Sequence, residues 1–364
     1  MKRRDFLKQS LTVSAGLALG GIPGFSRLAA AGEAGKWRTF EVTTRVEVLD
    51  PVGAVRVWVP VPLTTNTDYF KREGDKWSGN YKVARAVQYD RYGTGLVFAE
   101  WAPGEKAPAL EIASRFMTRD RQVDLTKKPG SSVKEDKAVL DYFRKPSKLI
   151  RTDGIVATTA RGITMGTKSD KDKAKAIYEW IVDNTFRDPK IRGCGIGDIS
   201  TMLRTGYLGG KCADLNALYV GLARASGLPA RDVYGIRCAD SGEFKSLGKA
   251  GDITGAQHCR AEVYLTGYGW LPVDPADVRK VVLEENKPEQ LPLDDPKVKK
   301  ARAKLFGSWE MNWLPYNYAH DLKLPQSNGP ELGYLMYPQT ETANGRKDSL
   351  DPKNFRYTID AKET

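Results

Sequence analysis

Three residues in the second half of the chain have the side chains needed for nucleophilic acyl transfer: Cys212, His258 and Asp274. Cys212 follows a Gly-Gly-Lys stretch, where we expect a helix to begin. The unpaired N–H groups and the dipole at a helix N-terminus favour a thiolate, which is the nucleophilic form of cysteine, and they can also stabilise an oxyanion. His258, one of only two histidines in the chain, could accept the thiol proton and return it to a leaving amine.

Asp274 could orient the imidazole of His258, as a catalytic triad requires. Residues 258–265 and 270–274 alternate like two strands, and the Thr-Gly-Tyr-Gly segment between them is typical of a hairpin turn. One register makes the two side chains neighbours on one face, and a one-residue slip separates them. A loop confined to residues 266–269 would set them ~10 Å out of step, at ~3.3 Å per residue, unless a bulge or twist corrects it.

Four sequence blocks around these residues resemble the transglutaminase-like superfamily: GGKCADLNAL at 209–218, ARASGLPAR at 223–231, HCRAEVY at 258–264 and GWLPVDP at 269–275. The resemblance covers about residues 165–280 and implies a papain-like core, in which the nucleophile helix packs on an antiparallel sheet that carries the histidine and the aspartate. It implies Cys212 as nucleophile, His258 as base and acid, and Asp274 as the orienting residue. Bacterial relatives often have Trp where this chain has Arg260, which predicts a more polar cleft wall.

Several polar residues near these blocks have a structural and a functional interpretation. Tyr207 and Asn216 are candidates for a second oxyanion donor, although we favour a structural role for both. Asp214 is expected to cap helix N–H groups or to bind nearby backbone. Cys194 lies in a glycine-rich loop that could line the cleft or be oxidised, and whose spacing does not match a nucleotide loop.

The remaining cysteines and the second histidine carry weaker signals. Cys238 and Cys259 lie on expected neighbouring strands and could form a disulfide or stay free. His320 is expected to pack or hydrogen-bond in the C-terminal segment, because a metal site would need another nearby ligand. We expect no cofactor and no metal.

The wider sequence predicts an α+β protein. Period-two runs between Trp37 and Val123 predict an N-terminal antiparallel, sandwich-like β domain over residues 32–135. Apolar stripes then predict helices near residues 169–184 and from Lys211 to the Gly-Leu-Pro at 227–229. We expect the papain-like, transglutaminase-like core over residues 136–280. The segment 281–364, rich in Pro, Trp and Tyr, is expected to be an irregular extension over this core.

We expect an export signal at the N-terminus. Residues 1–31 combine a basic start, a short apolar stretch and an Ala-Ala-Ala site, and Arg3-Arg4 with Phe6 resembles a twin-arginine signal. The mature protein would begin near Gly32, use the twin-arginine export machinery, work in the periplasm or outside the cell, and retain no membrane span. The net charge of +12 is not concentrated on one stripe, so a nucleic-acid binder is not expected.

These observations lead to one main hypothesis and three alternatives. The main hypothesis is an exported cysteine hydrolase that cleaves an amide or peptide bond in a peptide, a protein or the cell wall, through an acyl-thioester. The alternatives are a protein cross-linking transglutaminase, a catalytically silent peptide- or wall-binding module, and an inhibited or scaffold protein whose aromatic C-terminal segment plugs the cleft.

Overall fold

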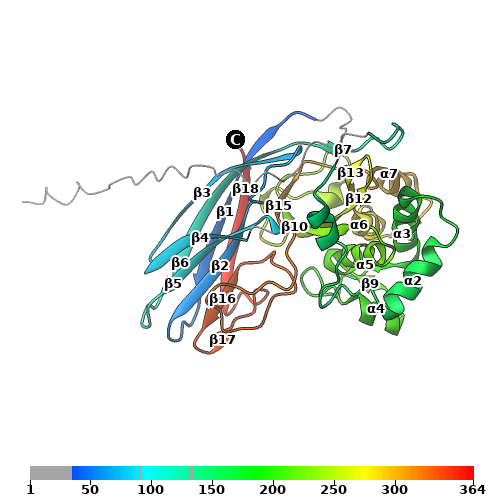
Figure 1. Cartoon of the computed structure of the whole chain (residues 1–364). Helices are drawn as coiled ribbons and strands as arrows, with labels where there is room; N and C mark the ends of the chain where they lie inside the picture. Colours follow the sequence, from blue (N-terminus) through cyan, green and yellow to red (C-terminus); the bar gives the residue numbers. More distant parts are fainter. Residues whose placement is uncertain (1–34, 90–91, 131–133) are drawn as a thin grey trace, which may run out of the picture.

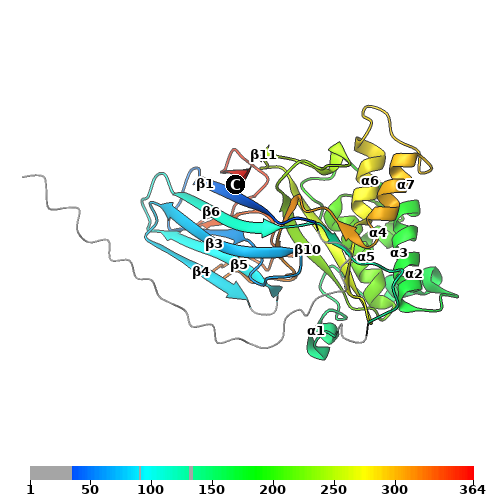
Figure 2. The same cartoon turned by 90° about the horizontal axis from the view of Figure 1, so that it is seen from above.

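The chain folds into a β-sandwich and a mixed α/β unit (Figure 1). The computed structural model describes residues 35–89, 92–130 and 134–364, so the expected signal segment lies outside the described residues. One sheet of the α/β unit has four strands. Helices cover its far face, and the sheet lies between them and the sandwich (Figures 1 and 2). The expected α+β class, with its strand-rich N-terminal region, is confirmed. Within the described residues, no helix is both long and apolar enough to cross a membrane.

Two five-stranded antiparallel sheets form the sandwich. The first contains, in spatial order, β11 (Gly251–Asp252), β18 (Phe355–Glu363), β1 (Arg38–Val48), β6 (Ala109–Thr118) and β3 (Phe70–Gly79). The second contains β17 (Gly345–Arg346), β16 (Gln339–Thr342), β2 (Val55–Val61), β5 (Thr94–Trp101) and β4 (Val83–Tyr89). Alternate residues of β1 are buried, as the period-two pattern predicts, and Val46 packs with Val57 and Phe355 in a core shared by both sheets.

The α/β unit is built on an antiparallel sheet in the order β13 (Gly269–Val273), β12 (Gln257–Leu265), β10 (Ala230–Arg237) and β15 (Trp313–Asn317). Helix α5 (Cys212–Ala225) packs on β10 and β12. It also contacts α2 (Gly154–Thr164), α3 (Asp170–Asn184), α4 (Ile199–Thr205) and α6 (Pro275–Glu284). Because these elements surround it, every residue of α5 before Ala225 is buried, rather than the single stripe that the sequence predicts.

Smaller elements complete this unit. They are β7 (Arg121–Gln122) paired with β14 (Ser308–Trp309), the parallel pair β8 (Phe186–Arg187) and β9 (Gly209–Gly210), and the helices α1 (Lys137–Tyr142), η2 (Lys245–Leu247) and α7 (Pro296–Lys304). Helix α3 begins as the sequence predicts, because the Ser169 side chain accepts a hydrogen bond from the Asp172 N–H.

The C-terminal segment is more ordered than the sequence suggests. Strand β15 joins the sheet of the α/β unit, whereas β16 and β18 pair with β2 and β1 of the sandwich. In Figure 1 the red β18 accordingly lies beside the blue β1. The expected irregular extension is thus a structural part of both units, because sheet partners far apart in sequence supply its hydrogen bonds. Removing it would therefore leave both units without strands that their sheets contain.

A buried ionic cluster joins the end of the sandwich segment to the central sheet. Glu262 of β12 is fully buried and pairs with Arg121 of β7 and with Arg231 of β10, the latter at 2.5 Å. The Arg231 guanidinium also lies 3.9 Å from the ring centres of Trp270 and Tyr318. Each charge therefore has partners that offset the loss of its hydration.

Candidate active site

Cys212 is the first residue of α5, as the Gly-Gly-Lys-Cys sequence predicts. Asp214, two residues later, fixes the start of this helix. Its carboxylate accepts hydrogen bonds from the N–H groups of Lys211, Ile196 and Gly197, at 2.9–3.0 Å. Asp214 therefore caps α5 and holds the glycine-rich loop that carries Cys194 against the start of this helix. Both roles agree with the expectation that Asp214 caps helix N–H groups or binds nearby backbone.

The first N–H groups of α5 are only partly available to a substrate. The Ala213 N–H donates to the Cys194 carbonyl, and the N–H groups of Asp214 and Leu215 donate to the Lys211 carbonyl. Among the described residues, this leaves the Cys212 N–H as the donor at the helix start. Of the helix-start N–H groups that the sequence analysis considered, the Cys212 N–H is therefore the one that can stabilise an oxyanion.

His258 and Asp274 are brought together by the start of α6. The hairpin pairs Ala261 with Val273, so the short turn leaves His258 two residues beyond the position opposite Asp274. Asp274 leaves the strand as the N-cap of α6, with φ −152° and ψ 73°, and its carboxylate reaches back along β12. His258 Nε2 consequently lies 2.7 Å from Asp274 Oδ2. The helix start corrects the mismatch, where we expected a bulge or a twist.

Further polar groups hold this pair. The Asn216 side chain of α5 donates to Asp274 Oδ1 at 3.1 Å and to the Cys259 carbonyl at 2.8 Å. Asp277 places a second carboxylate 3.3 Å from His258 Nε2, and Arg237 pairs with Asp277 at 2.6 Å. The sequence analysis did not identify Asp277 or Arg237, although the three-residue spacing from Asp274 places Asp277 on the same turn of a helix.

The charges around His258 and Cys212 favour an imidazolium and a thiolate. Burial and Arg237 oppose a positive imidazole, but Asp277 and Asp274 outweigh them and raise the pKa of His258 to about 9. The neighbouring thiols of Cys194 and Cys259, together with His258, hold the pKa of Cys212 well below its ordinary value despite its burial. Because Asp274 occupies Nε2, the Nδ1 atom of His258 is the nitrogen left for the sulfur.

All four cysteines are free thiols, so a bond between Cys238 and Cys259 is the wrong alternative. Cys259 lies opposite Tyr234 on β10, four residues before Cys238. That offset is ~13 Å along a strand at ~3.3 Å per residue, beyond the reach of a disulfide. Cys194 and Cys259 instead contact Cys212, whereas burial raises the pKa of Cys238.

A cavity of about 470 Å³ opens at Cys212. Its lining includes Cys194 and His258, and the C-terminal segment contributes Tyr337, Leu350 and Tyr357. That segment therefore forms a wall of the cleft, which still leaves this volume open beside the sulfur. The sequence analysis placed this segment over the core and offered it as a cleft plug, but it did not single out these three residues, because they reach the cleft only through the pairing of β16 and β18.

Three other candidate residues lie away from the cavity lining. The Tyr207 hydroxyl donates to Asp188 at 2.6 Å, and the Asn216 amide is used by Cys259 and Asp274. Arg260 is buried behind Asp274, 3.8 Å from its carboxylate, and its guanidinium lies 4.7 Å from the Trp313 ring centre. The expected polar cleft wall from Arg260 is therefore wrong, because this side chain is buried between the rings of Trp309 and Trp313 and the Asp274 carboxylate and does not line the cavity.

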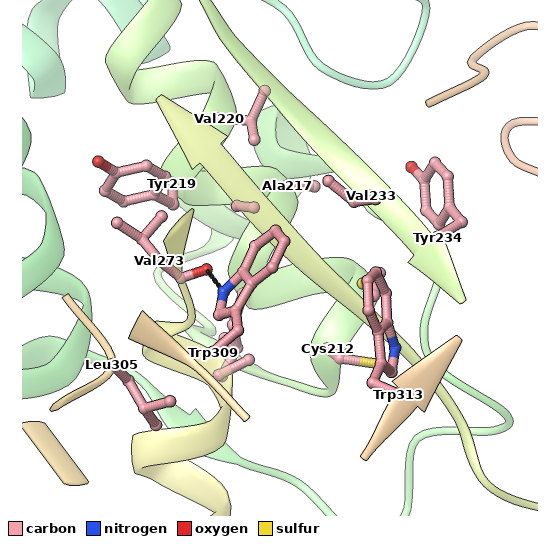
Figure 3. Packing of buried hydrophobic residues seen from close by; sticks show 14 of the residues in the cluster. Cys212, Ala217, Tyr219, Val220, Val233, Tyr234, Val273, Leu305, Trp309 and Trp313 are labelled. Atoms are coloured by element: carbon pink, nitrogen blue, oxygen red, sulfur yellow. Dashed lines mark hydrogen bonds between the residues drawn. The ribbon is translucent and has the colours of Figure 1, made fainter. Parts of the chain in front are cut away.

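Trp309 and Trp313 of the C-terminal segment belong to the same hydrophobic core as Cys212 (Figure 3). Trp313 donates its indole N–H to the His258 carbonyl at 2.9 Å, and Trp309 donates to the Val273 carbonyl at 3.4 Å. His320 lies farther along, 3.2 Å from the Asp232 carboxylate and 3.3 Å from the Tyr234 hydroxyl, as its expected packing role implies.

His258, Asp274 and Asp277 could in principle share a metal ion, since their ligand atoms all lie within 4.8 Å of one another. Each carboxylate already has a cationic neighbour, Arg237 for Asp277 and Arg260 for Asp274. Two guanidinium groups beside the cluster disfavour a further cation there.

Comparisons with known proteins agree with this geometry. The family model of the transglutaminase-like superfamily matches residues 157–275. An uncharacterized protein of Haemophilus influenzae is 34% identical over 343 residues, which cover 89% of this chain and 91% of that protein. A crystal structure from Cytophaga hutchinsonii, described provisionally as a cysteine protease, has a TM-score of 0.51 at 16% identity and covers 90% of this chain and 99% of its own.

A more distant structure is the periplasmic domain of TgpA from Pseudomonas aeruginosa, with a TM-score of 0.34 at 15% identity, covering 69% of this chain and 93% of that chain. The full-length similarity to the Haemophilus protein and the family match establish the relationship. The chain belongs to the transglutaminase-like superfamily.

Proposed function

We propose that the protein is a cysteine-dependent acyl-transfer enzyme that hydrolyses an amide or peptide bond through Cys212, His258 and Asp274. One observation carries the proposal. The Cys212 sulfur lies at a helix start, in an open cavity, beside an imidazole whose other nitrogen is held by Asp274 at 2.7 Å. A helix-start thiolate, a proton carrier and an orienting carboxylate are the groups that acyl transfer requires.

In this mechanism the Cys212 thiolate attacks the carbonyl carbon of the substrate, and the Cys212 N–H stabilises the oxyanion that forms. His258 donates a proton from Nδ1 to the leaving nitrogen as the carbon–nitrogen bond breaks, which leaves an acyl-thioester and neutral imidazole. Water then attacks the thioester, His258 accepts its proton, and the thiolate leaves with the carboxylic acid product released. Asp274 keeps Nδ1 directed at the sulfur throughout.

We favour water over an amine as the acceptor, because an exported enzyme works in an aqueous compartment and the sequence contains no recognisable amine pocket. The proposed substrate is accordingly an amide of a peptide, a protein or the cell wall. Residues 1–31 support the further proposal that the twin-arginine machinery exports the chain to the periplasm or beyond.

The decisive experiment measures alkylation of each cysteine by iodoacetamide, mapped by mass spectrometry. At about pH 6, Cys212 should react at least ~30-fold faster than a free cysteine, whose pKa of ~8.5 leaves it almost wholly protonated. Cys212→Ala should abolish this rapid labelling, and Cys238→Ala, which removes a buried thiol with a raised pKa, should leave it intact. Unchanged labelling in Cys212→Ala, or ordinary reactivity in the wild type, would refute the proposal and favour a silent binding module.

A further inference from the structure

The charges that line the cavity at Cys212 are unequal. Besides the Cys212 thiolate and the His258 imidazolium, which offset each other, the described lining contains one carboxylate, Asp252, and five Lys or Arg side chains: Arg187, Lys211, Arg237, Lys249 and Lys280. Two of them have strong partners behind the wall, since Arg237 pairs with Asp277 and Arg187 with Glu284, each at 2.6 Å. Lys249 and Asp252 interact and offset each other.

Lys211 and Lys280 remain as the cations whose charge the protein does not balance closely. Among the described residues Lys211 forms no ion pair within 4 Å, Asp188 interacts with it only at longer range, and Lys211 immediately precedes the nucleophile. Lys280 comes from α6, and its nearest carboxylate, Glu284, lies 4.0 Å away and is already bound by Arg187. Two separate elements therefore direct positive charge into the cavity beside Cys212.

The charged side chain of Lys280 destabilises the folded protein when no anion is bound beside it. Its side chain is only 16% exposed, and burial together with repulsion from Arg237 lowers its pKa to about 8. Asp277 and Glu284 offset this loss only in part, so a bound anion would further stabilise the buried ammonium group. The buried ammonium group of Lys280 is therefore suited to bind an anionic group of a ligand in the cavity.

Resting on the proposed function, we propose that this cleft selects acidic peptides, with a carboxylate close to the amide that Cys212 attacks. Among peptides, the common anionic group is a carboxylate, from an Asp or Glu side chain or from a free C-terminus. Lys211 and Lys280 would bind that carboxylate and hold the neighbouring carbonyl at the sulfur. Selection arises because an acidic substrate gains attraction from both ammonium groups, which a neutral substrate does not gain.

The test compares two alkylating reagents that differ in charge. Iodoacetate and iodoacetamide attack a thiolate by the same displacement of iodide, so the ratio of their rate constants at Cys212 reports the preference for an anion. Lys280→Gln and Lys211→Gln should each lower this ratio about three- to tenfold, as expected for one charge within ~6 Å of the reagent. Raising the salt concentration should lower the wild-type ratio as well. The matched control is Lys82→Gln, at an exposed position between β3 and β4 of the sandwich, which should leave the ratio unchanged.

A second measurement on the wild type avoids any folding defect of the variants. Glutarate should slow the reaction of Cys212 with iodoacetamide, whereas its neutral diamide, glutaramide, should not. Equal effects of the two compounds, together with ratios that the lysine substitutions leave unchanged, would overturn the acidic-substrate proposal while Cys212 stays rapidly alkylated. If Cys212 of the wild type is not rapidly alkylated by either iodoacetate or iodoacetamide, the proposed function itself is refuted. Stronger protection by inorganic phosphate than by glutarate would also overturn the assignment to carboxylates.

Discussion

Asp274→Asn should lower the pKa of His258 markedly. In the wild type, Asp277 and Asp274 outweigh burial and Arg237 and raise this pKa to about 9. The Asp274 Oδ1 atom accepts from the Asn216 amide and from the Asp277 N–H, both at 3.1 Å, so an asparagine would keep its oxygen there. Its NH2 group would then face His258 Nε2, which could only accept a hydrogen bond. The substitution therefore removes a charge and also favours the neutral imidazole.

The size of the effect follows from the geometry. With charge centres ~4 Å apart and an effective dielectric constant of ~20, the lost attraction is ~4 kcal/mol, or ~3 pKa units. Asp277 stays 3.3 Å from the same nitrogen, and its attraction is present in both proteins. We therefore expect a fall of about 3 units, from about 9 to a pKa of about 6.

Nuclear magnetic resonance can read this pKa directly, because the chain has only two histidines. The imidazole carbon signals of His258 and His320 would be followed between pH ~5 and ~10 in both proteins, with His320→Gln to assign them. A wild-type His258 that titrates near its ordinary value of ~6.5, or one whose pKa is unchanged in Asp274→Asn, would refute the reasoning.

The same shift predicts the pH dependence of stability. Because the folded-state pKa of His258 is raised, its contribution of about 3 kcal/mol to the free energy of unfolding is fully present below its unfolded pKa of ~6.5. It is lost as the pH rises through about 9. Asp274→Asn should reduce this loss, measurable by urea denaturation at several pH values, and an unchanged pH dependence would contradict the assignment.

Two further substitutions test the packing that supports the site. Glu262→Ala leaves the guanidinium groups of Arg121 and Arg231 buried without their carboxylate. It should lower the free energy of unfolding, measured by urea denaturation, by about 3–5 kcal/mol. An unfolding midpoint equal to that of the wild type would show that the cluster is not stabilising. Gly195→Ala should lower it by at least ~2 kcal/mol, since φ is +95° and a Cβ would lie 1.8 Å from the Asp214 carboxylate. Gly166→Ala is the matched control, because φ is +81° but its Cβ would contact nothing within 4 Å; equal losses in the two variants would show that the contact with Asp214 is unimportant.

Local patterns were sufficient to predict the separate elements. Alternation in the first strand gave β1, the Ser169 capping signal gave the start of α3, and the Gly-Gly-Lys-Cys stretch placed Cys212 at the start of α5. Each of these depends on hydrogen bonds and burial within a few residues, which is the range over which residue types constrain the backbone. The family resemblance, carried by four ordered blocks, was confirmed by the family match.

Tertiary contacts decided how these pieces form a site. The His258–Asp274 contact depends on where β13 ends and α6 begins, and the hairpin register alone would have separated the two side chains. The strands of the C-terminal segment find partners hundreds of residues away, so their sequence has no local sign of the cleft wall that they build. The basic cleft has the same origin, because Lys211 and Lys280 are unremarkable in sequence and become neighbours of one cavity only when α5 and α6 pack together.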